Sequence, residues 1–152
     1  RPIPIGHGQT ISQPFIVAYM TDILDISPLH TVLEIGTGSG YQAAVLSEIA
    51  LKVFTVERIK TLADQTKILL EHYNNIHMKI GNGYKGWEKN APYDRIIVTA
   101  MPNYIPKSLI NQLKDGGKMI IPVRGILILV TKTGKTYTEK SLIGVRFVPL
   151  VE

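Results

Sequence analysis

The glycine-rich segment Gly36-Thr37-Gly38-Ser39-Gly40 is the part of the chain whose composition and spacing most directly suggest chemistry. It follows a β-rich run at residues 31–35 and precedes a segment of helical composition at 41–50, which predicts a strand, a tight turn and a helix. Glycines at such a turn let the backbone lie against a ligand. The spacing G-x-G-x-G directly behind Glu34 differs from the G-x-G-x-x-G fingerprint that surrounds a pyrophosphate.

Two acidic residues near this turn favour S-adenosylmethionine, which carries no phosphate, as the ligand. The carboxylate of Glu34 suits the ammonium group of this cofactor, directly or through water, and would repel a pyrophosphate. Glu57 lies 21 residues after Gly36, which is the spacing at which an acid accepts hydrogen bonds from ribose hydroxyls. We therefore expect Glu34, Gly36, Thr37, Gly38 and Glu57 to contact the cofactor.

Two other segments are weaker candidates for binding. Asn82 and Gly83 follow a predicted third strand, where a side-chain oxygen could accept a hydrogen bond from the amine of an adenine; an ordinary turn explains the same residues. Residues 6–14 are rich in glycine and hydrogen-bonding side chains, which is typical of a binding loop or of a connection to a capped helix. The four histidines have no metal-ligand spacing, so no metal site is predicted.

Composition limits the classes of protein that need to be considered. The 152 residues suffice for one domain, and the absence of cysteine excludes disulfides, thiolate metal sites and a cysteine nucleophile. Without a signal-like start or a long apolar run, we expect a cytoplasmic protein that does not bind membranes. The net charge of +5 comes from dispersed cations, which favours a solvated surface over a nucleic-acid interface. Nothing suggests a large apolar interface, so we expect a monomer.

The pattern of apolar residues predicts an α/β fold. Strands expected at 31–35, 52–56, 76–80, 94–98 and 118–121 alternate with helices expected at 41–50, 59–73 and 105–113. This order predicts a Rossmann-like, doubly wound, mostly parallel sheet with helices on both faces. Together with the glycine turn that favours S-adenosylmethionine, it suggests the class I S-adenosylmethionine-dependent methyltransferase type. A further helix at 13–24 should cross the ligand-binding edge. Residues 126–132 and 142–148 should form an antiparallel C-terminal strand pair.

Five segments, at residues 4–14, 32–42, 56–58, 93–100 and 145–150, together resemble the protein-L-isoaspartate (D-aspartate) O-methyltransferase family. The resemblance implies transfer of a methyl group from S-adenosylmethionine, with S-adenosylhomocysteine as the product. The acceptor would be the free α-carboxylate of L-isoaspartyl or D-aspartyl residues in damaged proteins and peptides, and the methyl ester would begin their repair through a succinimide.

The resemblance also implies roles for individual residues. Ser12 matches the active-site serine of the family, and Gln9, Thr10 and Ile11 match the adjacent cofactor-contacting loop. Arg146 and Val148 lie in the segment that resembles the one along the substrate peptide. Gly36, Glu57, Asn82 and Gly83 match positions that hold the cofactor.

The chain departs from the family pattern at two places. The family usually has Asp where Asn82 stands, and an amide oxygen can still accept from adenine. We expect residues 1–152 to be a single methyltransferase domain that lacks an N-terminal segment of the family and a short stretch near 124–126.

Three alternatives remain open from the sequence. An RNA or base methyltransferase would suit the isoelectric point near 9.4, although the cations are dispersed and an Asn-Pro-Pro-Tyr type segment is missing. A non-catalytic module could keep the S-adenosylmethionine fold as an interaction scaffold. A dehydrogenase is disfavoured by the glycine spacing.

Overall fold

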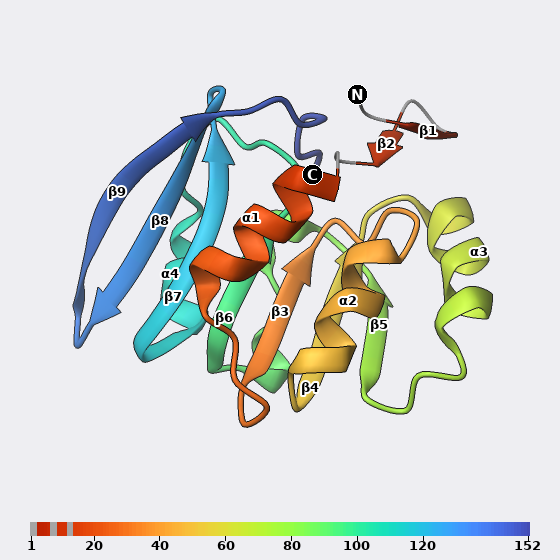
Figure 1. Ribbon diagram of the computed structural model, residues 1–152, viewed down its shortest axis with the longest axis horizontal. Coiled ribbons are helices and arrows are strands. Elements are labelled where there is room, and N and C mark those ends of the chain that lie inside the picture. Colours follow the sequence, from red (N-terminus) through yellow and green to blue (C-terminus); the bar gives the residue numbers. More distant parts are fainter. Residues whose placement is uncertain (1–2, 7–8, 12–13) are drawn as a thin grey trace.

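A seven-stranded sheet organises the computed structural model, which describes residues 3–6, 9–11 and 14–152 (Figure 1). Its strands run in the spatial order β5-β4-β3-β6-β7-β8-β9. They are β3 (Thr31–Ile35), β4 (Lys52–Glu57), β5 (Ile76–Ile80), β6 (Tyr93–Val98), β7 (Leu113–Val123), β8 (Ile126–Thr133) and β9 (Thr136–Gly144).

Strand β3 lies inside this sheet, between β4 and β6, and pairs in parallel with both. Further outward, β5 pairs in parallel with β4, and β7 pairs in parallel with β6. Strand β8 pairs antiparallel with β7, and β9 pairs antiparallel with β8. The predicted mostly parallel α/β sheet with an antiparallel end is therefore confirmed. Because the parallel strands share one direction, the loops after β3, β4 and β6 meet at a single edge, where such sheets bind ligands.

Helices cover both faces of the sheet, as the sequence predicts. They are α1 (Pro14–Leu24), α2 (Tyr41–Ile49), α3 (Lys60–Leu70), α4 (Lys107–Gln112) and two short 3₁₀ helices, η1 (Gly83–Lys85) and η2 (Glu88–Asn90). On one face, Met20 of α1 and Leu46 of α2 share a fully buried cluster with Val32 of β3. On the other, Leu109 of α4 packs in a cluster with Leu33. Each such buried side chain contributes about 1.5–3 kcal/mol. No helix in the described ranges has the length and apolar character needed to cross a bilayer.

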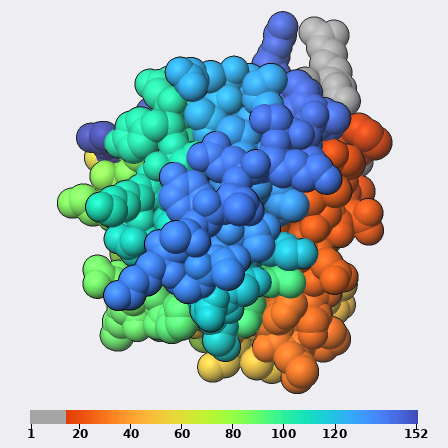
Figure 2. All heavy atoms as spheres, turned by 90° about the vertical axis from the view of Figure 1, so that its left-hand side faces the viewer, coloured from red at the N-terminus to blue at the C-terminus, as the bar shows by residue number. Residues whose placement is uncertain are grey.

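The C-terminal hairpin differs from its predicted boundaries. Strand β9 directly follows the turn at Gly134 and ends at Gly144, whereas the sequence predicts it at 142–148. Residues 145–148 are not a strand, and Pro149 forms a single parallel bridge with Met101. The prediction fails because most of β9 is solvent-exposed, so its side chains show no apolar alternation. In Figure 2 the hairpin covers much of the visible face, with α1 along one side.

The tight connection between β7 and β8 occupies the position where a stretch of the family is expected to be missing. Arg124 and Gly125 form a two-residue turn in which both residues have positive φ, 49° and 83°. Two consecutive positive φ values are typical of the type I′ turn that joins neighbouring antiparallel strands. Strands β7 and β8 are therefore joined without a longer loop.

The N-terminal residues form a separate two-stranded antiparallel sheet of β1 (Ile3–Gly6) and β2 (Gln9–Ile11). Part of the predicted loop over 6–14 is thus a short strand. Ser12, like residues 7, 8 and 13, lies outside the described residues, and so does its predicted catalytic role.

A first prediction concerns Gly40, which precedes α2 with φ 89°. A Cβ at this position would lie 2.8 Å from Cγ2 of Thr66 and 3.2 Å from Cδ2 of Leu70, both on α3. Gly116 also has positive φ, 80°, but a Cβ there would meet nothing within 4 Å. Gly40→Ala should therefore lower the free energy of unfolding by about 1–3 kcal/mol more than Gly116→Ala. Denaturant unfolding of both variants measures the difference, and equal losses would contradict the close packing of α3 on the turn.

Candidate functional site

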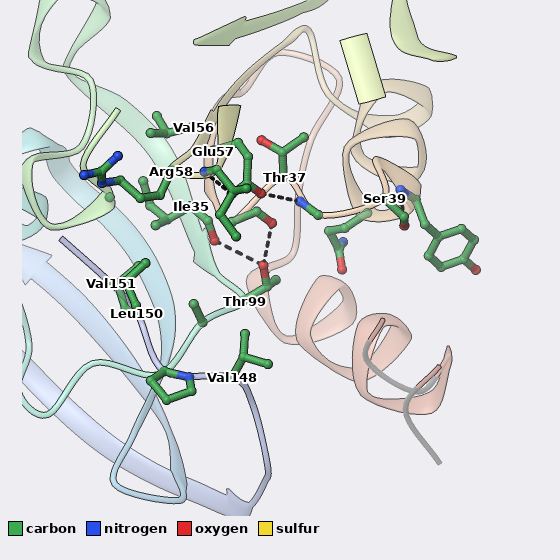
Figure 3. Close-up of a pocket in the computed structure, with 18 of the residues that line it drawn as sticks. Ile35, Thr37, Ser39, Val56, Glu57, Arg58, Thr99, Val148, Leu150 and Val151 are labelled. Atoms are coloured by element: carbon green, nitrogen blue, oxygen red, sulfur yellow. Dashed lines mark hydrogen bonds between the residues drawn. The ribbon is translucent and has the colours of Figure 1, made fainter. Parts of the chain in front are cut away.

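A pocket of about 780 Å³, including its open mouth, lies where the parallel strands end (Figure 3). The lining comes from the turn after β3, the end of β4, the loops after β5 and β6, helix α1 and the C-terminal segment. The lining residues are Val17, Ile35, Gly36, Thr37, Gly38, Ser39, Tyr41, Gln42, Val56, Glu57, Arg58, Ile59, Gly83, Thr99, Ala100, Val148, Pro149, Leu150 and Val151.

The glycine turn itself forms one wall of this pocket. Gly36 and Gly38 have φ values of 96° and 53°, in the left-handed region that side chains rarely adopt. At Gly36 the space is also limiting, because a Cβ would lie 2.8 Å from Oγ1 of Thr99. The strand–turn–helix prediction is confirmed, and the turn exposes backbone next to the pocket as a bound cofactor requires.

Three side chains from three different elements hold the turn in place. At the end of β4, Glu57 accepts hydrogen bonds from the backbone N–H groups of Gly38 (2.9 Å) and Ile59 (3.0 Å), one at each carboxylate oxygen. From α3, the Thr66 hydroxyl donates to the carbonyl of Gly38 at 2.6 Å. From the loop after β6, the Thr99 hydroxyl lies 2.8 Å from the carbonyl of Gly36 (Figure 3). The turn is therefore held by tertiary contacts as well as by its own glycines.

Glu57 is almost fully buried yet lines the pocket. Each of its oxygens accepts one backbone hydrogen bond and has a second lone pair available. The carboxylate is thus fixed in orientation and can still accept hydroxyl donors. This arrangement suits the ribose-binding role that the sequence predicts.

Glu34 occupies a different environment from the one that the sequence suggests. It is fully buried and is not among the pocket-lining residues. The Thr55 hydroxyl donates to its Oε1 at 2.6 Å, and the hydroxyls of Thr37 and Thr55 are also 2.6 Å apart. Burial raises the pKa of Glu34 to about 8; the Thr55 hydrogen bond opposes this shift and the charge of Glu57 adds to it.

The Glu34 carboxyl is consequently mostly protonated at neutral pH, and the geometry provides no direct ion pair between it and a bound ammonium. The sequence could not reveal this, because burial from both faces of the sheet sets the protonation state. That Glu34 contributes to cofactor binding stays a prediction. Any such contribution would pass through the hydroxyls of Thr55 and Thr37.

Asn82 and Gly83 differ in their relation to the pocket. Oδ1 of Asn82 accepts the backbone N–H of Tyr84 at 3.0 Å, which caps η1, and Asn82 is not among the lining residues. Gly83 does line the pocket, and a Cβ there would lie 2.5 Å from Cγ2 of Ile35 and 3.0 Å from Cδ1 of Leu150. Gly83 therefore permits close packing at this end, and an adenine contact of Asn82 stays a prediction.

The C-terminal segment closes another side of the pocket. The backbone N–H of Met101 donates to the carbonyl of Val148 at 2.7 Å, and that of Leu150 donates to the carbonyl of Met101 at 3.0 Å. These two bonds hold Val148 and Leu150 against the pocket, opposite the glycine turn (Figure 3). Arg146 is exposed and is not among the lining residues. Its predicted contact with substrate therefore remains untested.

Sequence reasoning missed several members of this site. Thr66 and Val151 lie in no motif, and Gln42, Thr99 and Leu150 lie in segments that resemble the family but were not assigned a contact with the cofactor. Their positions depend on packing between elements distant in the sequence, so only the composition of the neighbouring elements could have suggested them.

A second prediction follows from the raised pKa of Glu34. Because the folded-state pKa, about 8, exceeds the ordinary value of 4.5, the folded chain holds an extra proton between these pH values. The associated stability is complete below pH 4.5 and is lost as pH rises through 8, by at most ~1.4 kcal/mol per pH unit. Glu34→Gln removes this titration. Its melting temperature relative to the parent chain should therefore rise by more than ~2 °C between pH 5 and pH 9.

The matched control is Glu139→Gln, which changes an exposed carboxyl of β9. Its melting temperature relative to the parent should not depend on pH in this way. If Glu34→Gln gives the same difference at both pH values, the buried carboxyl does not titrate as proposed.

Comparison with known proteins identifies the family. The family model described as protein-L-isoaspartate(D-aspartate) O-methyltransferase matches residues 1–152. A protein-L-isoaspartate O-methyltransferase of Dictyoglomus thermophilum is 55% identical over 97% of this chain, and the match covers 70% of that relative.

Two solved structures agree in fold over 99% of this chain. One is a protein-L-isoaspartate O-methyltransferase that superposes with a TM-score of 0.91 at 28% identity. The match covers 51% of that chain. The other, from Plasmodium falciparum, was solved in complex with S-adenosyl-L-homocysteine; it gives a TM-score of 0.81 at 27% identity and is covered to 79%. The chain belongs to the protein-L-isoaspartate (D-aspartate) O-methyltransferase family, whose members are S-adenosylmethionine-dependent protein methyltransferases.

Proposed function

We propose that this chain transfers a methyl group from S-adenosylmethionine to the free α-carboxylate of L-isoaspartyl and D-aspartyl residues, and so begins their repair through a succinimide. The observation that carries the proposal is the buried Glu57 carboxylate, which is fixed beside a left-handed glycine turn in a pocket at the ligand-binding edge of the sheet. Family membership supports the substrate class.

The residues of the pocket fit this cofactor. Glu57 accepts the ribose hydroxyls, and the turn at Gly36 and Gly38 allows the backbone to approach the amino-acid part. Gly83 lines the same pocket and packs closely against Ile35 and Leu150, which leaves an apolar wall for the adenine. When bound, the cofactor supplies a methyl group on a positively charged sulfur.

The chemistry requires no general base in the protein. A carboxyl with an ordinary pKa near 4 is already ionised at neutral pH. Transfer converts an anion and a cation into two neutral products, so a dry site of low polarity favours the step. The apolar side chains of Val17, Ala100, Val148 and Leu150 line such a site and limit the access of water.

The substrate is held, in this proposal, by Ser12 and by the segment that contains Arg146 and Val148. Ser12 donates one hydrogen bond to the substrate carboxylate and orients it. The isoaspartyl defect lies in the backbone and occurs in many different sequences. Recognition through main-chain groups near Val148 suits such a substrate, because it does not depend on the neighbouring side chains. In the same proposal, the chain acts in the cytoplasm as a monomer with a single domain.

None of the three alternatives has support from the relatives, which are named as protein-L-isoaspartate O-methyltransferases. A base methyltransferase would also need an electropositive face, and the cations of this chain are dispersed. A non-catalytic scaffold would bind the cofactor without turnover, which a direct assay distinguishes.

The proposal is tested by incubating the chain with methyl-labelled S-adenosylmethionine and either an isoaspartyl peptide or its normal aspartyl isomer. We expect label on the isoaspartyl peptide and none on the isomer, because only the former presents the free α-carboxylate. Cofactor binding without transfer to either peptide would contradict the proposal, and so would label in RNA when RNA is supplied in a parallel incubation.

Ser12→Ala should slow turnover by about 10- to 1000-fold, the usual range for one catalytic hydrogen bond. Because the substrate carboxylate needs orientation and not deprotonation, the pH dependence of the remaining activity should match that of the parent. Single-turnover methyl transfer measures both quantities. An unchanged rate would remove Ser12 from the active site.

A further inference from the structure

Two buried side-chain atoms in the described part of the chain have no hydrogen-bond partner: Oε2 of Glu34 and Oε1 of Gln42. Glu34 is not among the pocket-lining residues, whereas Gln42 is, although its exposed fraction is only 6%. A buried acceptor left unpaired costs about 1–3 kcal/mol. The Gln42 oxygen therefore has a strong preference for a donor that enters the pocket.

The orientation of the Gln42 amide is set by helix α1. Its Nε2 donates to Oγ1 of Thr21 at 3.0 Å, and the Thr21 hydroxyl donates to the carbonyl of Val17 at 2.8 Å. A hydroxyl has one proton, and that of Thr21 is committed to Val17. Thr21 can then only accept from Gln42, so the amide nitrogen must face Thr21 and the oxygen must face away from it.

Gln42 lines the same pocket as the predicted ribose site at Glu57, but from a different element. It belongs to the first turn of α2 and is tied to α1, which packs against β7. Glu57 ends β4, on the opposite side of β3 from β6 and β7. With the ribose at Glu57, a cofactor whose amino-acid part passes the glycine turn would bring that part towards Gln42.

We propose that Oε1 of Gln42 accepts a hydrogen bond from the α-ammonium group of the bound cofactor, and that Thr21 is the positioning residue that holds the amide in the accepting orientation. This inference rests on the proposed function. The amino-acid part of the cofactor offers an ammonium, which can only donate, and a carboxylate, which can only accept. An amide oxygen pairs with the former and not with the latter.

The inference is tested by titration calorimetry with two ligands, S-adenosylhomocysteine and its analogue in which hydrogen replaces the α-amino group. The measured quantity is the ammonium preference, the dissociation constant of the analogue divided by that of S-adenosylhomocysteine. The parent chain should bind S-adenosylhomocysteine at least about 10-fold more tightly than the analogue, as expected for a hydrogen bond to a charged group.

Gln42→Met keeps the length of the side chain and removes the acceptor. It should reduce the ammonium preference about 10-fold while changing the affinity for the analogue less than about 3-fold. Thr21→Val should reduce the preference in the same direction because the amide can then reverse, and Thr21→Ser, which keeps the hydroxyl, should restore it. A general loss of packing would weaken both ligands equally and leave the preference unchanged.

The possible failures are distinguishable. If the parent chain binds neither ligand, the proposed function itself is wrong. If it binds both ligands equally, or if Gln42→Met and Thr21→Val leave the preference at the parent value, the cofactor site stands and the role of Gln42 is wrong. Should Gln42→Met not fold, the Thr21 pair decides the question, because Thr21 lies outside the pocket lining.

Discussion

The polar backbone of the turn after β3 is the constraint on which the rest of the site depends. Left-handed residues direct N–H and carbonyl groups away from regular secondary structure, and in a buried setting each such group needs a partner. Glu57, Thr66 and Thr99 provide these partners from β4, α3 and the loop after β6. The turn thus takes its shape only when these elements have packed around it, which couples the geometry of the site to the folding of the sheet.

The two acidic residues beside the turn differ because their surroundings differ. Glu57 receives two backbone hydrogen bonds at the edge of the sheet, whereas Glu34 lies within the sheet and receives one bond from a threonine hydroxyl. Burial therefore favours the neutral form of Glu34 and raises its pKa. A neutral Glu34 avoids a buried negative charge on β3, next to the turn that lines the pocket.

Much of the fold and part of the site could be predicted from the sequence. Local signals sufficed where one short segment determines the structure: the glycine turn, the spacing from Gly36 to Glu57, and the buried strands β3, β4 and β6. They failed for β9, whose exposed side chains have no apolar period. They could not give the charge state of Glu34, because it depends on tertiary burial. The contacts of Thr66 and Thr99 with the glycine turn could not be found, because a hydroxyl that binds a distant carbonyl leaves no pattern along the chain.

The choice of an amide at position 42 has a consequence for catalysis. The α-ammonium is present in both the methyl donor and its demethylated product, so a hydrogen bond from it to Gln42 stabilises both equally. Such uniform binding strengthens the affinity of the site and does not lower the barrier to methyl transfer. A carboxylate at Gln42 would bind the ammonium more strongly, but it would leave a buried, unpaired charge each time the product departs. A neutral acceptor held by Thr21 avoids that cost, and it leaves the rate of the chemical step to the contacts around the sulfur and the substrate carboxylate.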